Sequence, residues 1–221
     1  MQQAKDPALS PKIVIVGGVA GGASAAARAR RVNERARIVV YERDAYISFA
    51  NCGLPYYFGG EITDRNSLLV ASPELFDARF RIEVNVRHEV LSIDRAARTV
   101  TVEDLATGGR FVETFDKLIL SPGATPIMPP LPGMDAKGVF SLRTIEDMDR
   151  IAAALPDARR AVVVGAGYVG LEVAEQFVRR GLEVTVVELQ PQILPFLDRE
   201  MAVRPDADQS VVGERHRQNE N

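Results

Sequence analysis

The single cysteine of the sequence, Cys52, lies where redox chemistry can be expected. It belongs to the stretch Ser-Phe-Ala-Asn-Cys-Gly-Leu-Pro-Tyr at 48–56, which begins six residues after Glu42, the acidic end of a stretch typical of dinucleotide binding. A second such stretch follows more than a hundred residues later. One thiol between two nucleotide-binding units suggests that electrons pass from one bound nucleotide to another and then to sulfur.

The residues around Cys52 leave two interpretations open. Free cysteine is among the most buried residue types and is usually inert. Asn51 and Gly53, however, are not apolar packing residues. Ser48 and Pro55 place the thiol in a turn or at a helix start, where a thiolate is more nucleophilic. Because the chain has no second cysteine, disulfide chemistry would need a mixed disulfide with an outside thiol, or a sulfenic acid.

The later nucleotide-type stretch has the strict glycine spacing of a dinucleotide turn. Gly165, Gly167 and Gly170 follow an apolar strand at 161–164 and precede a helix. The first glycine makes the turn, the second admits the pyrophosphate, and the third lets the helix approach the strand. Glu188 ends the next strand, where a carboxylate holds ribose hydroxyls and repels a 2′-phosphate, which favours NADH over NADPH. A tight turn without a nucleotide is the alternative.

The earlier stretch departs from this spacing. A buried strand at 12–16 is followed by Gly17 and Gly22, but Val19 stands at the second glycine position, with Gly21 close by. A helix at 23–33, a strand at 37–41 and then Glu42 complete a βαβ unit. Gly17 and Gly165 lie 148 positions apart, and the two units are alike, which indicates an internal repeat. Without further context, a structural glycine turn stays possible for the first unit.

Other segments complete an α/β fold with two Rossmann-like units. Alternating apolar residues over 81–115 predict antiparallel strands inserted into the first unit, after a helix at 73–80 capped by Ser72. A strand at 116–120 leads to Ser121, Gly123 and Ala124. Four prolines over 126–133 predict a rigid linker, and 141–155 is expected to be helical.

Composition argues against several classes of partner. Hydrophobic residues make up 46% and charged residues 26%, with a net charge of −3, so neither a nucleic acid nor a membrane surface is expected as a partner. One cysteine and two separated histidines give no metal-ligand cluster, and His88 is expected to be an ordinary strand residue. A single cysteine and a polar N-terminus fit the cytoplasm.

Taken together, these motifs resemble the pyridine nucleotide-disulfide oxidoreductase superfamily, and within it the coenzyme A-disulfide reductase group with its single-cysteine relatives, the NADH oxidases and peroxidases. The glycine turn at 17–22 matches the flavin turn of that group, including its valine. The stretch at 48–56 matches the active-site segment of the reductases, and 118–124 matches a second flavin-contacting strand. The resemblance covers about 12–201.

The resemblance implies roles for individual residues, with FAD and NADH or NADPH as cofactors. Cys52 would be the redox nucleophile, and Tyr168 would cover the flavin until the nicotinamide enters. The FAD-binding residues would be Gly17, Val19, Ala20, Gly21, Gly22, Glu42, Arg43, Ser121, Gly123 and Ala124. The nicotinamide-binding residues would be Gly165, Gly167, Tyr168, Val169, Gly170 and Glu188. The coenzyme A-binding residues would be Ser24, Arg28, Arg31, Ser48 and Asn51.

Two departures from the group qualify these roles. Leu75 stands where some members have a substrate-binding lysine. Relatives are also considerably longer, and they complete both domains and form homodimers.

The arginines of the first helix have a second interpretation that does not depend on the resemblance. Arg28, Arg30 and Arg31 are expected to form a solvated helix face, although they could bind an anionic substrate.

The expected organisation therefore has four parts. These are a disordered leader at 1–11, a partial FAD-binding domain at 12–140, a partial NAD(P)-binding domain at 141–203 and a disordered tail at 204–221. The strand at 183–187 would lack further strands beside it, and its edge and the helix faces would expose apolar surface. We expect weak FAD retention or none. The functional alternatives are a reductase of coenzyme A disulfide, persulfide or polysulfide, an NADH oxidase or peroxidase using a sulfenic acid, and an inactive truncated fragment.

Overall fold

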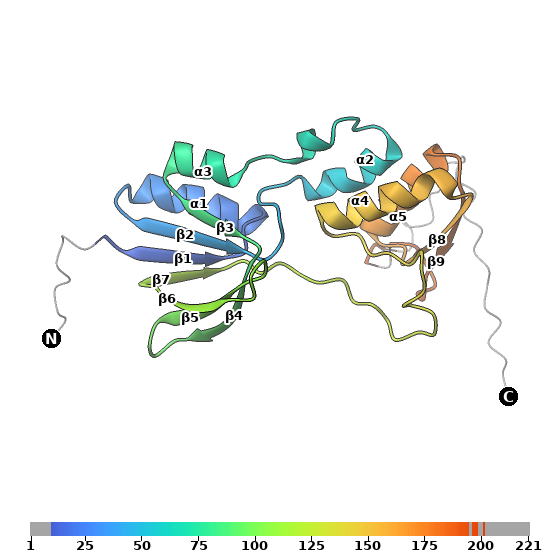
Figure 1. Cartoon of the computed structure of the whole chain (residues 1–221). Helices are drawn as coiled ribbons and strands as arrows, with labels where there is room; N and C mark the ends of the chain where they lie inside the picture. The colour runs from blue at the N-terminus through green and yellow to red at the C-terminus, as the bar shows by residue number, and fades with distance from the viewer. Residues whose placement is uncertain (1–9, 195, 199–200, 202–221) are drawn as a thin grey trace. The chain divides into compact units, whose positions relative to one another are not determined.

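The computed structural model describes residues 10–194, 196–198 and 201. Its described residues form two compact units (Figure 1). The first unit comprises the described residues of 1–51, 65–130 and 143–145, and the second comprises those of 52–64, 131–142 and 146–221. Most of the expected leader, and all of the expected tail at 204–221, lie outside the described residues.

A four-stranded parallel sheet forms the centre of the first unit, in the order β3-β2-β1-β7. Its strands are β1 (Lys12–Val16), β2 (Arg37–Glu42), β3 (Glu83–Val86) and β7 (Lys117–Leu120). β1 and β2 are continuous apolar runs because a central parallel strand is covered on both faces. The predicted βαβ unit is confirmed by the parallel register of β1 and β2.

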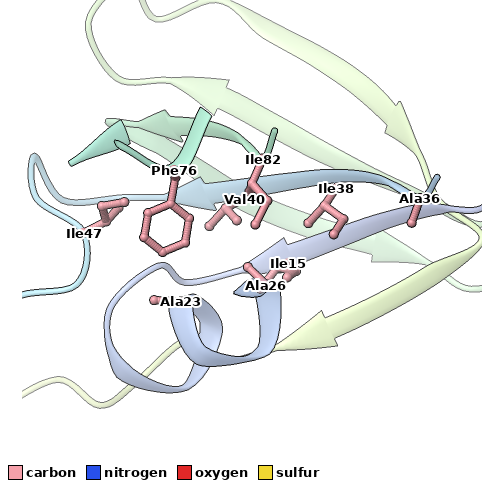
Figure 2. Packing of buried hydrophobic residues seen from close by; sticks show 9 residues of the cluster. All are labelled: Ile15, Ala23, Ala26, Ala36, Ile38, Val40, Ile47, Phe76 and Ile82. Carbon is pink, nitrogen blue, oxygen red and sulfur yellow. The ribbon is translucent and has the colours of Figure 1, made fainter. Parts of the chain in front are cut away.

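Two helices cover one face of this sheet. They are α1 (Ala20–Val32) and α3 (Pro73–Phe80). Ala23 and Ala26 are buried, and their small side chains let α1 approach the sheet closely. Figure 2 shows the apolar cluster between these helices and the strands, made of Ile15, Ala23, Ala26, Ala36, Ile38, Val40, Ile47, Phe76 and Ile82. The predicted cap of α3 is confirmed, since Ser72 Oγ accepts a hydrogen bond from the Leu75 N–H at 3.3 Å.

The predicted antiparallel insertion is a three-stranded sheet of β4 (His88–Asp94), β5 (Thr99–Asp104) and β6 (Arg110–Thr114). The prediction was wrong for its first part, because the segment with Ile82, Val84 and Val86 forms β3, which pairs parallel to β2. Period-two alternation identifies a half-buried strand but does not say which sheet the strand joins. Val100 and Val102 of β5 pack with Val14, Val39 and Tyr41 of the parallel sheet.

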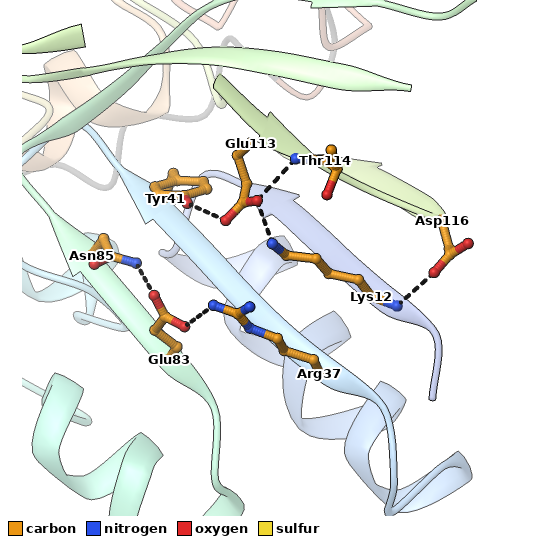
Figure 3. A network of polar contacts seen from close by, with 8 residues as sticks. All are labelled: Lys12, Arg37, Tyr41, Glu83, Asn85, Glu113, Thr114 and Asp116. Atoms are coloured by element: carbon orange, nitrogen blue, oxygen red, sulfur yellow. Dashed lines mark hydrogen bonds and ion pairs between the residues drawn. The ribbon is translucent and has the colours of Figure 1, made fainter. Parts of the chain in front are cut away.

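Polar contacts also join β6 to the parallel sheet (Figure 3). Glu113 accepts hydrogen bonds from the Lys12 ammonium and from Tyr41 Oη, the latter at 3.2 Å. Burial and the nearby Glu113 carboxylate raise the pKa of Tyr41 well above its usual range, so Tyr41 stays a neutral donor. The backbone N–H of Lys12 donates to Asp116 at 3.0 Å. These bonds fix the inserted sheet beside the strands that carry the glycine turn.

The second unit contains the two-stranded parallel sheet of β8 (Arg160–Val164) and β9 (Glu183–Val187), with α5 (Tyr168–Arg179) packed against it. It also contains α4 (Ile145–Ala154), except for Ile145 itself, and α2 (Leu54–Gly59), which contacts α5. Val162 and Val164 of β8 and Val187 of β9 are about half or more exposed. Among the described residues, short 3-10 turns occur at Leu155–Asp157 in this unit, at Arg65–Leu68 in the first unit and at Asn51–Gly53, where the chain passes from the first unit to the second.

The largest differences from the predicted element boundaries are at the starts of three helices. The helices α1 and α5 begin at Ala20 and Tyr168, inside the glycine motifs, because the last glycine of each motif adopts helical backbone. α4 begins at Ile145, four residues later than predicted. The residues at 52–64 cluster with the second unit, and those at 143–145 with the first. Every helix in the described part of the chain is too short or too polar to span a bilayer.

Candidate cofactor and cysteine sites

The first glycine turn is shaped by backbone contacts that exclude a side chain. Gly17 has φ +89°, and a Cβ on it would lie 2.0 Å from the carbonyl oxygen of Ser121. Its N–H donates to the Tyr41 carbonyl at 2.8 Å, and the Ser121 N–H donates to the Val16 carbonyl at 2.7 Å. A Cβ on Gly22 would lie 1.7 Å from the Gly17 carbonyl oxygen. The turn therefore requires glycine at both ends, as the sequence predicted.

The end of α1 at this turn is open to an anion. Its N-cap is Val19, and within the described residues no side chain caps this end. The first turn of α1, all of it described, contains no acidic residue. Free N–H groups and the positive end of the helix dipole favour a phosphate at such a place. Gly21 is close to Ser121 as well, with Ser121 Oγ 3.1 Å from the place a Cβ would take.

Glu42 closes the other side of the turn. It is 6% exposed, and its two carboxylate oxygens accept hydrogen bonds from the N–H groups of Gly18 at 2.6 Å and Asp44 at 2.9 Å. A carboxylate has about four acceptor positions, so each oxygen keeps one position for a ribose hydroxyl. The carboxylate is thus held by backbone while it remains able to accept further hydrogen bonds.

A cavity of about 530 Å³ opens in front of this turn within the first unit. It is lined by most of the residues predicted to bind FAD, namely Gly17, Val19, Ala20, Gly21, Glu42, Arg43, Ser121, Gly123 and Ala124. Gly22 is buried instead, and it supports the turn. Asn51, predicted to bind substrate, also lines this cavity. The open N-terminus of α1, the backbone-held carboxylate and the side-chain-free turn fit the diphosphate and ribose of FAD.

Sequence reasoning missed several residues of this cavity. Arg143 lies 3.5 Å from an Asp44 carboxylate oxygen, and its Nη2 is 2.5 Å from the place of a Gly123 Cβ. The glycine, with φ +71°, leaves room for this guanidinium. His88, expected to be an ordinary strand residue, starts β4 and also lines the cavity. No local motif marks Arg143, because it follows the proline-rich segment and reaches the cavity only in the folded unit.

The second glycine turn repeats these hydrogen bonds. Gly165 has φ +100°, and its N–H donates to the Val187 carbonyl at 2.8 Å. A Cβ on Gly170 would lie 2.0 Å from the carbonyl oxygen of Gly165. Glu188 accepts hydrogen bonds from the N–H groups of Ala166 at 2.7 Å and Gln190 at 2.9 Å. The bond from Ala166, followed by that from Gln190, lowers the pKa of Glu188.

The remaining predicted residues of this turn lie at the start of α5. Gly167 is the N-cap of the helix, and within the described residues no side chain caps it. Tyr168 and Val169 follow, and both are more than half exposed. The Tyr168 ring contacts the ring of Phe196, with centroids 4.6 Å apart. The turn thus presents N–H groups at the start of α5, which favour an anion. An aromatic pair lies beside them.

The repeat extends into the loop that follows each acidic residue. The N–H of Ser48 donates to the Gly18 carbonyl at 3.1 Å, and the N–H of Leu194 donates to the Ala166 carbonyl at 2.9 Å. Both donors have left-handed backbone, with φ of +46° and +48°. A serine and a leucine share no sequence pattern, so this correspondence was invisible before the structure.

The cysteine segment follows Ser48 directly. Cys52 is exposed and lies in the 3-10 turn Asn51–Gly53, which leads into α2, as predicted for a turn or a helix start. The N–H of Ala50 donates to the Leu68 carbonyl at 2.8 Å, and the N–H of Val70 donates to the Ser48 carbonyl at 2.9 Å. These bonds hold the chain that approaches the thiol.

The residues predicted to bind coenzyme A are only partly brought together. Ser24, Arg28 and Arg31 are exposed on α1, at a spacing that places them on one face of the helix. Ser48 is half-buried in the loop, and Asn51 is exposed. A further position noted for this pocket, Leu75, is 41% exposed at the start of α3.

The expectation of a solvated helix face was wrong for Arg30. It is 8% exposed, and its guanidinium donates to four backbone carbonyls, those of Glu34, Ala36, Phe80 and Arg81, at 2.6–2.7 Å. Burial lowers the pKa of Arg30. Its place in the helix sequence gave no sign of this role, because two of the carbonyls, those of Phe80 and Arg81, belong to a distant segment that reaches α1 only in the folded unit.

Comparisons with known proteins show which family the sequence and the fold resemble. The family model described as "Pyridine nucleotide-disulphide oxidoreductase" matches residues 11–207. The chain is similar to the coenzyme A disulfide reductase of Staphylococcus haemolyticus, with 41% identity over 192 residues, which is 86% of this chain and 43% of that protein. The chain therefore spans less than half the length of this relative.

Solved structures of enzymes of this kind are also similar to the chain. Reduced CoADR-RHD of Bacillus anthracis matches with TM-score 0.86 and 49% identity, over 89% of this chain and 36% of that one. An NAD-dependent persulfide reductase from A. fulgidus matches with TM-score 0.83 and 37% identity, over 87% and 37%. A water-forming NADH oxidase from Lactobacillus brevis matches with TM-score 0.84 and 34% identity, over 87% and 43%.

Proposed function

The chain belongs to the pyridine nucleotide-disulphide oxidoreductase family, whose members bind FAD and NADH or NADPH, and we propose that it reduces a small disulfide through Cys52. The observation that carries the proposal is one exposed thiol in a segment anchored, at Ser48, to the glycine turn of the first unit. Coenzyme A disulfide is the proposed substrate, with a related persulfide or polysulfide as a close variant. The likeness to coenzyme A disulfide reductases supports this choice.

The first unit is the proposed FAD site. The N–H groups at the start of α1 would bind the diphosphate, and Glu42 would accept ribose hydroxyls at its two remaining positions. Ser121, Gly123 and Ala124 would form the opposite wall. The chemistry that bound FAD supplies is two-electron transfer between a nicotinamide and sulfur.

The second unit is the proposed nicotinamide dinucleotide site. The N–H groups beyond Gly167 would bind the diphosphate, and Glu188 would accept hydrogen bonds from the ribose. The Glu188 carboxylate is ionised at neutral pH, as any glutamate with a pKa at or below its ordinary value is, and it would repel a 2′-phosphate. NADH is therefore the proposed reductant, ahead of NADPH.

The sulfur chemistry can be written so that atoms and electrons balance. The Cys52 thiolate attacks one sulfur of the substrate disulfide, forms a mixed disulfide and releases the first coenzyme A as a thiolate. Two electrons from NADH then cleave the mixed disulfide, which frees the second coenzyme A and restores the Cys52 thiolate. The sum is NADH, one proton and coenzyme A disulfide giving NAD⁺ and two coenzyme A thiols.

The exposed face of α1 is the proposed contact for the anionic end of the substrate. Arg28 and Arg31 place two guanidinium groups one turn apart, and Ser24 adds a hydroxyl. Guanidinium groups bind phosphates through paired hydrogen bonds, which suits the phosphates of coenzyme A. Ser48 and Asn51 would contact the substrate nearer to the thiol.

An oxidase is the second candidate, favoured by the likeness to a water-forming NADH oxidase. Cys52 would then cycle through a sulfenic acid, with oxygen or peroxide as the oxidant. That reaction involves no coenzyme A, so no substrate phosphates would need to be bound. Arg28 and Arg31 would consequently be dispensable.

An NADH-consumption assay on the FAD-loaded protein separates these candidates. We expect oxidation of NADH with coenzyme A disulfide to exceed that with hydrogen peroxide or oxygen, and Cys52→Ser to abolish it. Arg28→Ala combined with Arg31→Ala should raise the KM for coenzyme A disulfide and leave the KM for NADH unchanged. Equal rates for wild type and Cys52→Ser would overturn both candidates, and a colourless protein that takes up no added FAD would indicate an inactive chain.

A further inference from the structure

Helix α2 begins two residues after Cys52 and packs against α5, the helix that starts at the second glycine turn. Both helices belong to the second unit. The rings of Phe58 and Phe177 lie 5.3 Å apart at their centroids. Arg180 Nε donates to the Phe58 carbonyl at 2.7 Å. The end of α2 is therefore attached to the end of α5 distant from the glycine turn.

The centre of this contact is a buried amide, Gln176, which is fully excluded from solvent. Its Nε2 donates to Glu61 at 3.1 Å, while its Oε1 has no hydrogen-bond partner within the described part of the chain. That oxygen lies 1.8 Å from the place a Cβ on Gly59 would take, and Gln176 Cδ lies 2.6 Å from it. Glycine at 59 is thus required by Gln176.

A left-handed glycine brings the partner carboxylate to this amide. Gly60, with φ +91°, ends α2, and its N–H donates to the Tyr57 carbonyl at 3.0 Å. The chain then turns so that Glu61 also pairs with Arg179. Glu61 therefore contacts two residues of α5.

A buried amide with one unpaired atom costs free energy that an apolar side chain would avoid. An apolar residue, however, would let two helices slide along each other, whereas a hydrogen-bonded amide in a close-fitting gap permits a single register. Gln176 and Tyr168 lie on one helix, about 12 Å apart along its axis at 1.5 Å per residue. A rigid α5 therefore links the glycine turn to α2.

We propose that Gln176 is a positioning residue, which fixes the register of α2 on α5 and so sets where Cys52 stands relative to the second glycine turn. The proposal rests on the proposed function, in which Cys52 is the nucleophile and the turn binds NADH. Gln176 itself contacts neither the thiol nor a nucleotide. It acts through Gly59 and Glu61, the residues that end and follow α2.

A size exchange between Gly59 and Gln176 tests the proposal without any ligand. Because Cys52 is the only cysteine, the rate of alkylation by iodoacetamide in the full chain reports on that residue alone. We expect Gly59→Ala and Gln176→Ala each to change this rate by roughly twofold to thirtyfold, the range for mutations that alter coupling. In the double variant the Oε1 and Cδ clashes are gone, and only a 3.0 Å contact with the Gln176 Cβ remains. Its rate should return close to that of wild type.

Two further variants keep this test decisive. Gln176→Leu retains the volume and removes the amide, so it should stay folded and still change the alkylation rate. Val178→Ala, at a 59% exposed position on the same helix, is the control and should keep the wild-type rate. Folding of each variant is checked by circular dichroism. Wild-type rates in folded Gln176→Leu, or a double variant no nearer to wild type than Gly59→Ala, would overturn the proposal.

Adding NADH separates this inference from the proposed function. We expect NADH to change the alkylation rate of Cys52 in wild type and to leave it unchanged in Gln176→Leu, while both proteins bind NADH with similar affinity in a fluorescence titration. Binding of NADH with the same effect on alkylation in both proteins would contradict the positioning role. Failure of wild type to bind NADH would contradict the proposed nicotinamide site, and the size exchange would then decide the role of Gln176 by itself.

Discussion

The two glycine turns share their hydrogen bonds but differ in what surrounds them. In each unit the N–H of the first glycine donates to the carbonyl of the residue before the acidic residue. The acidic side chain accepts from the N–H of the residue after that glycine, Gly18 or Ala166. The carbonyl of this same residue accepts from the N–H of a left-handed residue, Ser48 or Leu194. Gly17 is also pressed against Ser121, whereas no described atom lies within 4 Å of a Cβ placed on Gly165.

The difference follows from the number of strands. In the first unit β7 lies beside β1 and brings Ser121 to the turn, so the sheet itself builds one wall of the cavity. In the second unit the described sheet consists of β8 and β9, and three of its valines are about half or more exposed. The hydrogen-bonded turn is therefore a local property of a βαβ unit, while the enclosed cavity is a property of the larger sheet.

The largest expected effect comes from alanine at the first glycine of each turn. Gly17→Ala combines a left-handed backbone with a clash against the Ser121 carbonyl and should lower the free energy of unfolding by about 3 kcal/mol or more. Gly165→Ala carries only the backbone cost, about 1–2 kcal/mol. Urea denaturation measures both. Equal losses would show that β7 does not shape the first turn.

A smaller difference is expected between the two acidic residues. In Glu42→Gln, an amide N–H₂ replaces one carboxylate oxygen and faces a backbone N–H, so that two donors meet without an acceptor in a buried place. This should lower the free energy of unfolding by about 1–3 kcal/mol. Glu188→Gln should cost less, about 0.5 kcal/mol, since Glu188 is only half-buried and water can replace the lost bond. The same denaturation experiment compares them.

The pH dependence of the second variant provides its control. The pKa of Glu188 is lower in the folded chain than its ordinary value of 4.5, so its contribution is complete above that pH. It is lost as the pH falls below 4.5 and through the folded-state value, because the carboxylate is then protonated. The stability difference between wild type and Glu188→Gln should consequently be constant from neutral pH down to about 5 and vanish in stronger acid. A difference that grows with acidity would contradict this assignment.

The last comparison concerns changes of the opposite sign and tests whether the loops after the two acidic residues are equivalent. Ser48→Gly and Leu194→Gly each relieve a left-handed backbone, so each should stabilise its unit by about 0.5–1 kcal/mol. The gain at Leu194 should be the larger, because a bulky side chain is less tolerated there than serine. Thermal unfolding of the two variants measures the gains. Destabilisation at Leu194 alone would limit the repeat to the glycine turn and its acid.

Local patterns predicted the residues that need a particular backbone shape. Gly17, Gly22, Gly165 and Gly170 were found from spacing, because a turn between a strand and a helix imposes the same requirement in any protein. Glu42 and Glu188 were found because each ends a strand beside such a turn. Cys52 was placed correctly in a turn before a short helix from its neighbours in the sequence.

Residues that act across segments were not predictable in this way. Arg143 reaches the cavity beside Asp44, Arg30 binds four carbonyls of two segments, and the segment of β3 joins the parallel sheet. Each of these contacts depends on which strands pair and on where a loop leads the chain back to the sheet. Local sequence spacing predicts neither the pairing nor the path of the loop.

The sequence by itself therefore determined the two turns, their acids and the one thiol, because glycine geometry, strand periodicity and cysteine chemistry are local properties. Only the tertiary structure decided that Ser48 and Leu194 are equivalent and that Gln176 fits against Gly59. Those facts depend on close packing between distant segments, where tenths of an ångström decide which side chain a neighbour permits.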